Sequence, residues 1–479
     1  MRATSIKAIL LAASLIFPTF GFAQTKSKDA AAYANRGIAK LQKHDWDGAI
    51  AEFNRALQFD PKLAKAYLDR GVAKANKGYR DGAIADYNRA LQLDPKLAAA
   101  YQARAIAKLE KSDWDGAIAD FNRVLQFDPK LAKAYNGRGL AKVEKREWDG
   151  AMADFNRALQ LDPKLASAFN NRGLAKRRKH ELMVYGAVGL YQPDYALGTL
   201  KVEKDDLDAS IADFNHALQL DPKNAKAYYN RGVAKAGKDD LDGAIADYNR
   251  ALQLDPKLPG AYSDRGSAKL DRGDADGAIA DYNSALNFNP KFAEAYLNRG
   301  TAKAVRGDSN HAIVDINRAL QLDPKLSEAY IDRGFTNLLD RNFTAALRDY
   351  RRFCELSQRN QWYPRLTIWL MRSRLGEKEA ADKELASHFN AEAGSWPSKI
   401  QAYLLGNLSE TEFLAAAASR DANTDHGQHC EAWFYAGMKS LLAGNKSAAS
   451  EFFKKCLATE RKRTTEYHFA KAELKALGQ

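Results

Sequence analysis

The densest group of side chains that could do chemistry lies at residues 425–430, with the sequence DHGQHC. Carboxylate, imidazole and thiolate groups all bind zinc, but a zinc site needs four ligands that converge on one ion. A short loop ahead of a helix rarely supplies all four. The chain also lacks the G-x-S-x-G, Walker and H-E-x-x-H motifs. We therefore predict no metal, no cofactor and no catalytic residue, so the protein is not expected to be an enzyme.

Three cysteines in 479 residues exclude a disulfide-built scaffold. Cys430 and Cys456 lie in a helical hairpin predicted over 430–463, in which antiparallel helices bring the start of one near the end of the other. The two could form a disulfide in an oxidising compartment, or they could remain small buried thiols. Cys354 is expected to stay unpaired in the core.

The first 23 residues have the layout of a secretory signal peptide. Arg2 and Lys7 precede an apolar run over 8–17, and small residues lead up to Ala23. We predict cleavage after Ala23 and a flexible N-terminus over 24–29; a retained N-terminal anchor is the alternative. No cysteine lies near the predicted cleavage point, so a lipid anchor is not expected. No other segment is apolar over a length that would cross a membrane.

Lys and Arg outnumber Asp and Glu by 73 to 60, a formal charge of +13 that falls to +11 once Arg2 and Lys7 are removed. A basic excess in a cytosolic chain would suggest nucleic acid. In an exported chain it points instead to anionic envelope polymers or acidic protein surfaces. The interleaved signs are typical of a solvated face, and we predict no nucleic-acid partner.

Asp-Pro and Asn-Pro steps divide much of the chain into equal lengths. Their prolines are 34 residues apart, except for one gap of 59: Pro61, Pro95, Pro129, Pro163, Pro222, Pro256, Pro290 and Pro324. Counted from Ala30, small residues recur at the eighth, twentieth and twenty-seventh places of each unit, and an aromatic ring recurs at the twenty-fourth. Small residues let two antiparallel helices approach closely, and the ring fills the remaining gap. Proline ends the second helix.

This pattern resembles the tetratricopeptide repeat (TPR) family over 30–326. The resemblance implies an all-α fold: a right-handed superhelical solenoid of antiparallel helix pairs, with a helical C-terminal capping region. We expect four repeats over 30–165 and five over 191–360, the last one degenerate. Residues 166–190 are interpreted as a truncated repeat that has lost its second helix, either a hinge or contact loop or a tolerated scar. Residues 361–479 form the helical C-terminal region.

The first helix of each unit (helix A) departs from the common TPR pattern, because its seventh place is Arg and its eleventh is Lys. The second helix (helix B) carries an acid at the twenty-third place. The columns are Arg36, Arg70, Arg104, Arg138, Arg172, Arg231, Arg265, Arg299 and Arg333; Lys40, Lys74, Lys108, Lys142, Lys176, Lys201, Lys235, Lys269 and Lys303; and Glu52, Asp86, Asp120, Asp154, Asp213, Asp247, Asp281, Asp315 and Asp349. A buried Arg needs a partner, and its planar guanidinium suits a carboxylate. We predict a stacked Arg–Asp ladder; a basic stripe that binds anionic polymers is the alternative.

Helix A builds most of the inner face of a TPR superhelix, so its sixth and ninth places form the candidate binding groove. The candidates are Asn35, Asp69, Asn171, Asn230, Asp264, Asn298 and Asp332 at the sixth place, and Ile38, Val72, Ile106 and Leu140 at the ninth. An Asn side chain can pair with both the N–H and the C=O of a peptide backbone. We predict that the groove holds an extended or helical segment. The alternative is that these residues are solvated or belong to the core.

The C-terminal region carries a second resemblance. Motifs such as Trp396-Pro397, LLGNLS over 404–409 and EAWFYAG over 431–437 are similar, over roughly 360–478, to NlpI-type periplasmic TPR lipoproteins, although the lipid-attachment cysteine is missing. This resemblance implies a periplasmic scaffold in the bacterial cell envelope that docks proteases and cell-wall hydrolases and has no activity of its own.

The sequence therefore predicts an exported, non-catalytic scaffold that binds protein or peptide partners in its groove, most simply in the periplasm, with secretion as the other destination. Two alternatives remain open. One is a hydrolase or cell-wall enzyme with its site in 360–479, and the other is a binder of anionic envelope polymers through the Arg and Lys columns. The oligomeric state is left open.

Overall fold

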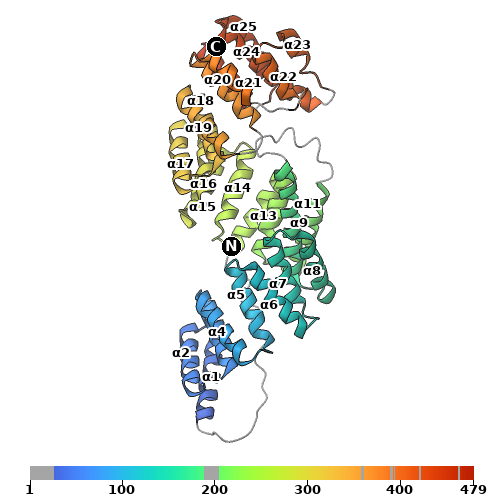
Figure 1. Ribbon diagram of the computed structural model, residues 1–479, viewed down its shortest axis with the longest axis vertical. Helices are drawn as coiled ribbons and strands as arrows, with labels where there is room; N and C mark the ends of the chain where they lie inside the picture. Colours follow the sequence, from blue (N-terminus) through green and yellow to red (C-terminus); the bar gives the residue numbers. More distant parts are fainter. Residues whose placement is uncertain are drawn as a thin grey trace. The chain divides into compact units, whose positions relative to one another are not determined.

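The computed structural model describes residues 26–187, 204–357, 361–388, 392, 394–419, 422–461 and 464–478. Within these residues the regular elements are α-helices joined by short turns, and no strand occurs among them (Figure 1). The predicted signal peptide lies outside the described residues. Because α1 begins at Lys26, the described part of the segment expected to be flexible is helical.

The chain divides into two compact units. The first contains the residues up to Lys179 together with Ala209–Lys223, and the second contains His180–Asp208 and the residues from Asn224 onward. Among the described helices of both units, none combines the length and the apolar character that a bilayer span requires.

Consecutive helices form antiparallel pairs in both units, which confirms the predicted all-α fold of stacked helix pairs; the superhelical hand stays a prediction. The early pairs are α1 (Lys26–Gln42) with α2 (Trp46–Phe59), α3 (Ala64–Asn76) with α4 (Arg80–Leu93), α5 (Ala98–Glu110) with α6 (Trp114–Phe127), and α7 (Ala132–Glu144) with α8 (Trp148–Leu161). They are followed by α9 (Ala166–Ala187) and α11 (Lys204–Leu220). The later pairs are α12 (Ala225–Gly237) with α13 (Leu241–Leu254), α14 (Pro259–Asp271) with α15 (Ala275–Phe288), α16 (Ala293–Val305) with α17 (Ser309–Leu322), and α18 (Ser327–Leu339) with α19 (Phe343–Leu356). The C-terminal helices are α20 (Trp362–Arg374), α21 (Lys378–His388), α22 (Trp396–Leu404), α23 (Glu410–Ala415), α24 (Ala422–Leu442), α25 (Lys446–Ala458) and α26 (Thr465–Ala476).

The pair α3–α4 shows why the small and aromatic places recur. A Cβ added to Gly71 would lie 2.5 Å from the ring of Tyr87, and that ring is buried. Ala83 and Ala90 on the facing side of α4 are fully buried. After the last turn Asp94 is extended, with φ −135°, as expected before a proline. Close approach of the two helices therefore depends on glycine at the eighth place, as the sequence predicts.

The third repeat solves the same packing problem differently. Its eighth place is Ala105, so the methyl group fills the space that the ring occupies elsewhere. The ring of Phe121 instead lies against Gly137, at the sixth place of the next repeat, where an added Cβ would clash with it. The sixth place of helix A is thus close to the preceding repeat.

The fifth helix pair combines α9 with α11, although a long segment separates the two helices in the chain. A Cβ on Gly173 of α9 would lie 2.9 Å from Phe214 of α11 and 3.0 Å from the backbone oxygen of Ser210. The structure therefore shows one repeat with about 25 extra residues between its helices (59 against the usual 34). It does not show the expected truncated repeat at 166–190 followed by a complete repeat from 191. Residues 188–203 lie outside the described residues.

The C-terminal region continues the pairing and contains the largest apolar core. Trp369 and Trp396 are buried in this core, together with Phe434 and Phe453. α24 and α25 repeat the TPR contact, because a Cβ on Gly437 would lie 2.6 Å from the ring of Phe453. The hairpin expected over 430–463 corresponds to these helices, and α24 begins before it, at Ala422.

Candidate functional site

The columns of Arg, Lys and Asp form a ladder whose rungs share one geometry. In α3, Arg70 donates two hydrogen bonds to Asp86 of α4, from Nε at 2.9 Å and from Nη2 at 2.6 Å. Lys74 lies 2.8 Å from the same carboxylate. The third guanidinium nitrogen, Nη1, donates to Asn54 of the preceding repeat at 2.7 Å. A buried carboxylate therefore receives two cations, and Arg70 also joins two repeats.

All nine Arg residues of the column are paired with the acid at the twenty-third place. The pairs are Arg36–Glu52, Arg70–Asp86, Arg104–Asp120, Arg138–Asp154, Arg172–Asp213, Arg231–Asp247, Arg265–Asp281, Arg299–Asp315 and Arg333–Asp349. The predicted ladder is present, and both columns are used in packing. Lys201 lies outside the described residues. A free basic stripe for anionic polymers therefore has little support in the described residues.

A second ladder, which the sequence analysis missed, joins neighbouring repeats through the turns. The cation at the fourteenth place binds the Asp at the eighteenth place of the preceding repeat, 30 residues earlier. Its members are Lys77–Asp47, Lys111–Asp81, Lys145–Asp115, Lys179–Asp149, Lys238–Asp208, Arg272–Asp242 and Arg306–Asp276. The periodic spacing of 30 was the available signal. These pairs are exposed on the acid side, so each one stabilises the stack only weakly.

Several of the predicted groove residues at the sixth place bind the preceding helix A. Asn171 donates to Asn136 at 3.1 Å. The Tyr229 hydroxyl donates to Asp264 at 2.7 Å, and the Thr301 hydroxyl donates to Asp332 at 2.7 Å. These three side chains therefore connect adjacent repeats. Of the other candidates, Asn230 is buried, Asn298 is half-buried, and Asn35 is exposed.

Asp69 differs from the other acids at the sixth place. The fifth and ninth places of the preceding helix, which supply the partners of Asp264 and Asp332, are Ala34 and Ile38. Burial raises the pKa of Asp69 to about 6, and the nearby Lys65 offsets this only in part. An apolar neighbour at the partner position explains why this carboxyl is costly to ionise.

The ninth place forms an apolar stripe along helix A in the first four repeats. Val72 is buried, whereas Ile38, Ile106 and Leu140 are half-buried, so part of each of these three side chains reaches the surface. Later in the chain the ninth place becomes polar. The groove assignment remains a prediction, and these partly exposed residues are its best-supported members.

The chemistry-bearing group at 425–430 lies inside α24, not in a loop ahead of a helix. His429 contacts Asp425, with 3.4 Å between Nδ1 and Oδ2. The Sγ atoms of Cys430 and Cys456 are 3.1 Å apart, and both residues are free thiols buried from solvent. Within the described residues, no three His, Cys, Asp or Glu side chains are grouped to hold a metal ion.

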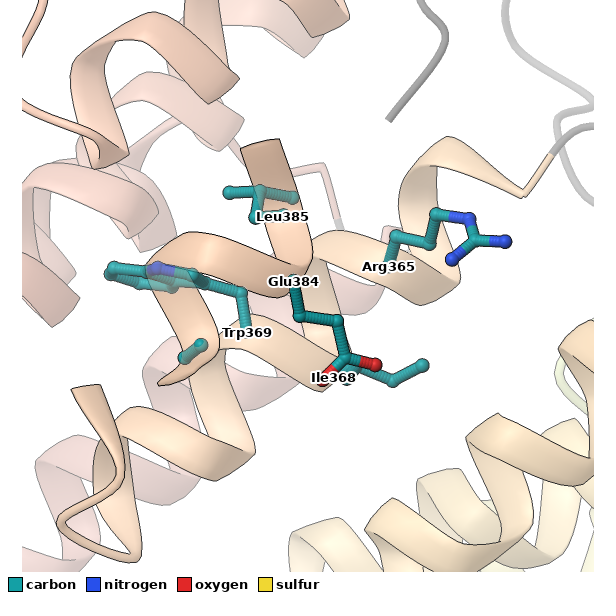
Figure 2. A pocket seen from close by; sticks show the side chains of 6 residues that line it. Arg365, Ile368, Trp369, Glu384 and Leu385 are labelled. Carbon is teal, nitrogen blue, oxygen red and sulfur yellow. The ribbon is translucent and has the colours of Figure 1, made fainter. Parts of the chain in front are cut away.

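A small cleft lies between α20 and α21 in the C-terminal region (Figure 2). Arg365, Ile368, Trp369, Glu384 and Leu385 line it. Burial alone would raise the pKa of Glu384, but Arg372 at 2.5 Å and Arg351 at 3.2 Å lower it. Glu384 is thus held as a carboxylate between guanidinium groups. The lining contains no nucleophile, so the cleft gives no support to a hydrolase site in this region.

Comparisons with known families agree with this architecture. Models described as TPR repeat match residues 39–78, 139–179 and 266–304, and models described as tetratricopeptide repeat match 195–259 and 64–97. Together with the stacked helix pairs, these matches define a tetratricopeptide-repeat protein.

Several solved structures are similar to the chain at low identity. A tetratricopeptide repeat protein from Parabacteroides merdae is 17% identical, with 57% of this chain and 98% of that chain covered and a TM-score of 0.45. Yeast Tom70 is 16% identical, with 88% and 99% covered and a TM-score of 0.41. PilW, a type IV pilus biogenesis factor, is 22% identical, with 49% and 96% covered and a TM-score of 0.40.

Proposed function

We propose that this protein is a non-catalytic scaffold of the bacterial cell envelope that binds an extended or helical segment of a partner protein along the helix A face. The observation that carries this proposal is the division of labour along helix A. The seventh and eleventh places are committed to the Arg–Asp ladder, which leaves the half-buried apolar ninth place as a regular contact surface. TPR folds generally bind protein or peptide partners, which supports the class of function.

The first four repeats offer the most apolar form of this surface. Ile38, Ile106 and Leu140 recur at a spacing of whole repeats, and the ladder fixes the spacing between successive helices. Apolar side chains presented at a fixed interval suit a partner with regularly spaced apolar residues. An acidic polymer would need free cations, whereas the column cations here are paired.

The envelope setting rests on the signal-like residues 1–23 and on the similarity of residues 360–478 to NlpI-type periplasmic lipoproteins. By that similarity the partners would be envelope proteins such as proteases or cell-wall hydrolases. Since the predicted leader has no nearby cysteine, the mature protein would be in the periplasm, without a lipid anchor.

Site-specific photocrosslinking in whole cells tests the proposal. A photoreactive amino acid is placed at Ile106 or at Leu140, and the matched control places it at Ala119, an exposed residue of α6. We expect partner crosslinks in the envelope fraction from the first two positions and not from Ala119. Equal crosslinking from all three positions would contradict the groove, and turnover of peptidoglycan or peptide by the purified protein would contradict a non-catalytic role.

Substitution measures how much the same surface contributes. Ile106→Asp and Leu140→Asp should weaken partner capture at least tenfold, whereas Ala119→Asp should leave it unchanged. Each variant is first compared with the wild type by circular dichroism and Tm, so that loss of binding is separated from unfolding. Retention of full capture by both folded ninth-place variants would exclude this face.

A further inference from the structure

The C-terminal hairpin holds two thiols in contact. Cys430 lies in α24 and Cys456 lies in α25, with 3.1 Å between their sulfur atoms and no exposed surface on either residue. A disulfide bond needs sulfurs about 2.05 Å apart, so a displacement of about 1 Å separates the free thiols from the bonded state. The two helices already oppose the two side chains, and no change of fold is required.

The repeat pattern shows that this pair is unusual within the chain. Cys430 and Cys456 occupy the first and twenty-seventh places of the closing repeat. In other repeats these places are mostly alanine, for example Ala64 with Ala90 and Ala225 with Ala251. Cysteine replaces alanine at both places of the same hairpin, where each thiol meets the other.

We infer that Cys430 and Cys456 are joined by a disulfide in the mature protein, and that this bond locks α24 to α25 at the C-terminal end of the second unit. The inference rests on the proposed export to an oxidising compartment. It adds a covalent modification site to the scaffold, and it does not depend on which partner binds the helix A face.

Thiol–disulfide exchange with a small-molecule disulfide or a disulfide oxidoreductase balances the reaction. The Cys430 thiolate attacks the oxidant and releases one of its sulfurs as a thiolate. The Cys456 sulfur then attacks Cys430 in the mixed disulfide, forms the Sγ–Sγ bond and releases the second sulfur. The two cysteine protons end on the two thiols of the reduced oxidant. Hydrogen bonding to Cys456 lowers the pKa of Cys430 to about 7, which favours Cys430 as the attacking thiolate.

Burial determines when this exchange takes place. The Thr464 hydroxyl lies 3.5 Å from the Cys430 sulfur and caps α26, which packs against both α24 and α25. An oxidant therefore reaches the thiols before α26 is in place, during folding. In the finished protein the same covering excludes reductants, so the bond should resist reduction until the C-terminal region unfolds.

Thiol trapping with mass mapping of the full-length protein tests this inference. We expect whole cells treated with a maleimide to leave Cys430 and Cys456 unlabelled and linked in one tryptic peptide pair, whereas denatured protein labels Cys354. The bond should survive millimolar dithiothreitol under native conditions. Labelled thiols at both positions in the cellular protein would overturn the inference.

Refolding in vitro separates this inference from the proposed location and function. Reduced, unfolded protein refolded with oxidised glutathione should form the Cys430–Cys456 bond, with a C-terminal Tm roughly 5–10 °C above the reduced form. Failure to form the bond there overturns the geometric argument. Formation in vitro with free thiols in cells overturns the inference for the mature protein and also contradicts export. The photocrosslinking result is independent of both.

Two variants control for folding. Cys430→Ala and Cys456→Ala install the residue that other repeats of this chain carry at these places, so both should fold. Each should lose the Tm difference between oxidised and reduced protein. Cys354→Ala should keep it, because burial raises the pKa of Cys354 to about 11 and the residue has no cysteine partner. Loss of the difference in Cys354→Ala would contradict the assignment.

Discussion

Arg172 of α9 donates to Asp213 of α11 with the same two-bond geometry as the other rungs, although the two residues are 41 positions apart and not 16. Lys176 completes the rung at 2.8 Å from the same carboxylate. An insertion of about 25 residues therefore leaves the ladder in register. Loop closure accounts for this tolerance, since its entropic cost rises only slowly with loop length.

Deletion of the insertion should restore an ordinary repeat. Removing residues 180–204 would join Lys179 to Asp205 and give the sequence KDDLD, which also occurs at 238–242. Because the Arg172–Asp213 rung and the Lys179–Asp149 pair both lie outside the deleted segment, we expect folding with a helical circular dichroism spectrum and a Tm at or above that of the full chain. A Tm lower by more than about 5 °C would show that the segment packs on the array.

The ladder carboxylates should be more important for stability than any acid of the turns. Asp120→Asn leaves Arg104 and Lys108 facing a neutral amide at a buried position. Breaking a buried ion pair costs about 3 kcal/mol, which we expect as a lower Tm and a lower urea midpoint. The matched control is Asp115→Asn, which removes the partner of Lys145 at an exposed site and should change neither midpoint measurably. Equal effects of the two variants would contradict the ladder.

Features that recur at a fixed period could be predicted from the sequence. The Gly71–Tyr87 contact and the Arg70–Asp86 pair each lie within one repeat, and every further repeat supports the same interpretation. The pairing of α9 with α11 could not be deduced in this way. A gap of 59 residues fits both 34 with an insertion and 68 with a deletion, and only the contacts of Arg172 and Gly173 decide between them.

The candidate binding site was harder to predict, because it depends on contacts between repeats. The period places residues on a face of helix A but does not say what the preceding helix presents to that face. Asp264 and Asp332 find hydroxyl partners there. The apolar ninth place is less affected, because residues such as Leu140 remain half-buried at the edge of the packed interface.

The turn between helices A and B should be improved by glycine. Its fifteenth place has a positive φ in many repeats, at Gly78 (86°) and at Ser112 (62°), for example. A residue with a Cβ is disfavoured in this region by about 1 kcal/mol relative to glycine. Ser112→Gly should therefore raise the Tm slightly, and Gly78→Ser should lower it. Thermal scans of both variants check the pair, and a lower Tm for Ser112→Gly would be inconsistent with a strained turn.

Asp69 should make the first unit less stable as the pH rises. Its pKa is about 6 in the folded protein and close to 3.8 when exposed, so the folded state binds the proton more tightly. The free energy of unfolding is then unaffected by this group below pH 3.8, falls between pH 3.8 and 6, and stays lower above pH 6. A shift of about two units corresponds to about 3 kcal/mol at most.

Asp69→Asn isolates this effect from other titrating groups. The variant should be more stable than the wild type at pH 7, and the difference should shrink to zero near pH 4, as measured by urea midpoints at several pH values. Asp81→Asn is the matched control, because its carboxyl is exposed in the adjoining helix α4. Since α1 offers only Ala34 and Ile38 at the partner places, Ala34→Ser should supply a hydroxyl donor and reduce the pH dependence. A wild-type profile parallel to that of Asp69→Asn would contradict burial as the cause of the raised pKa.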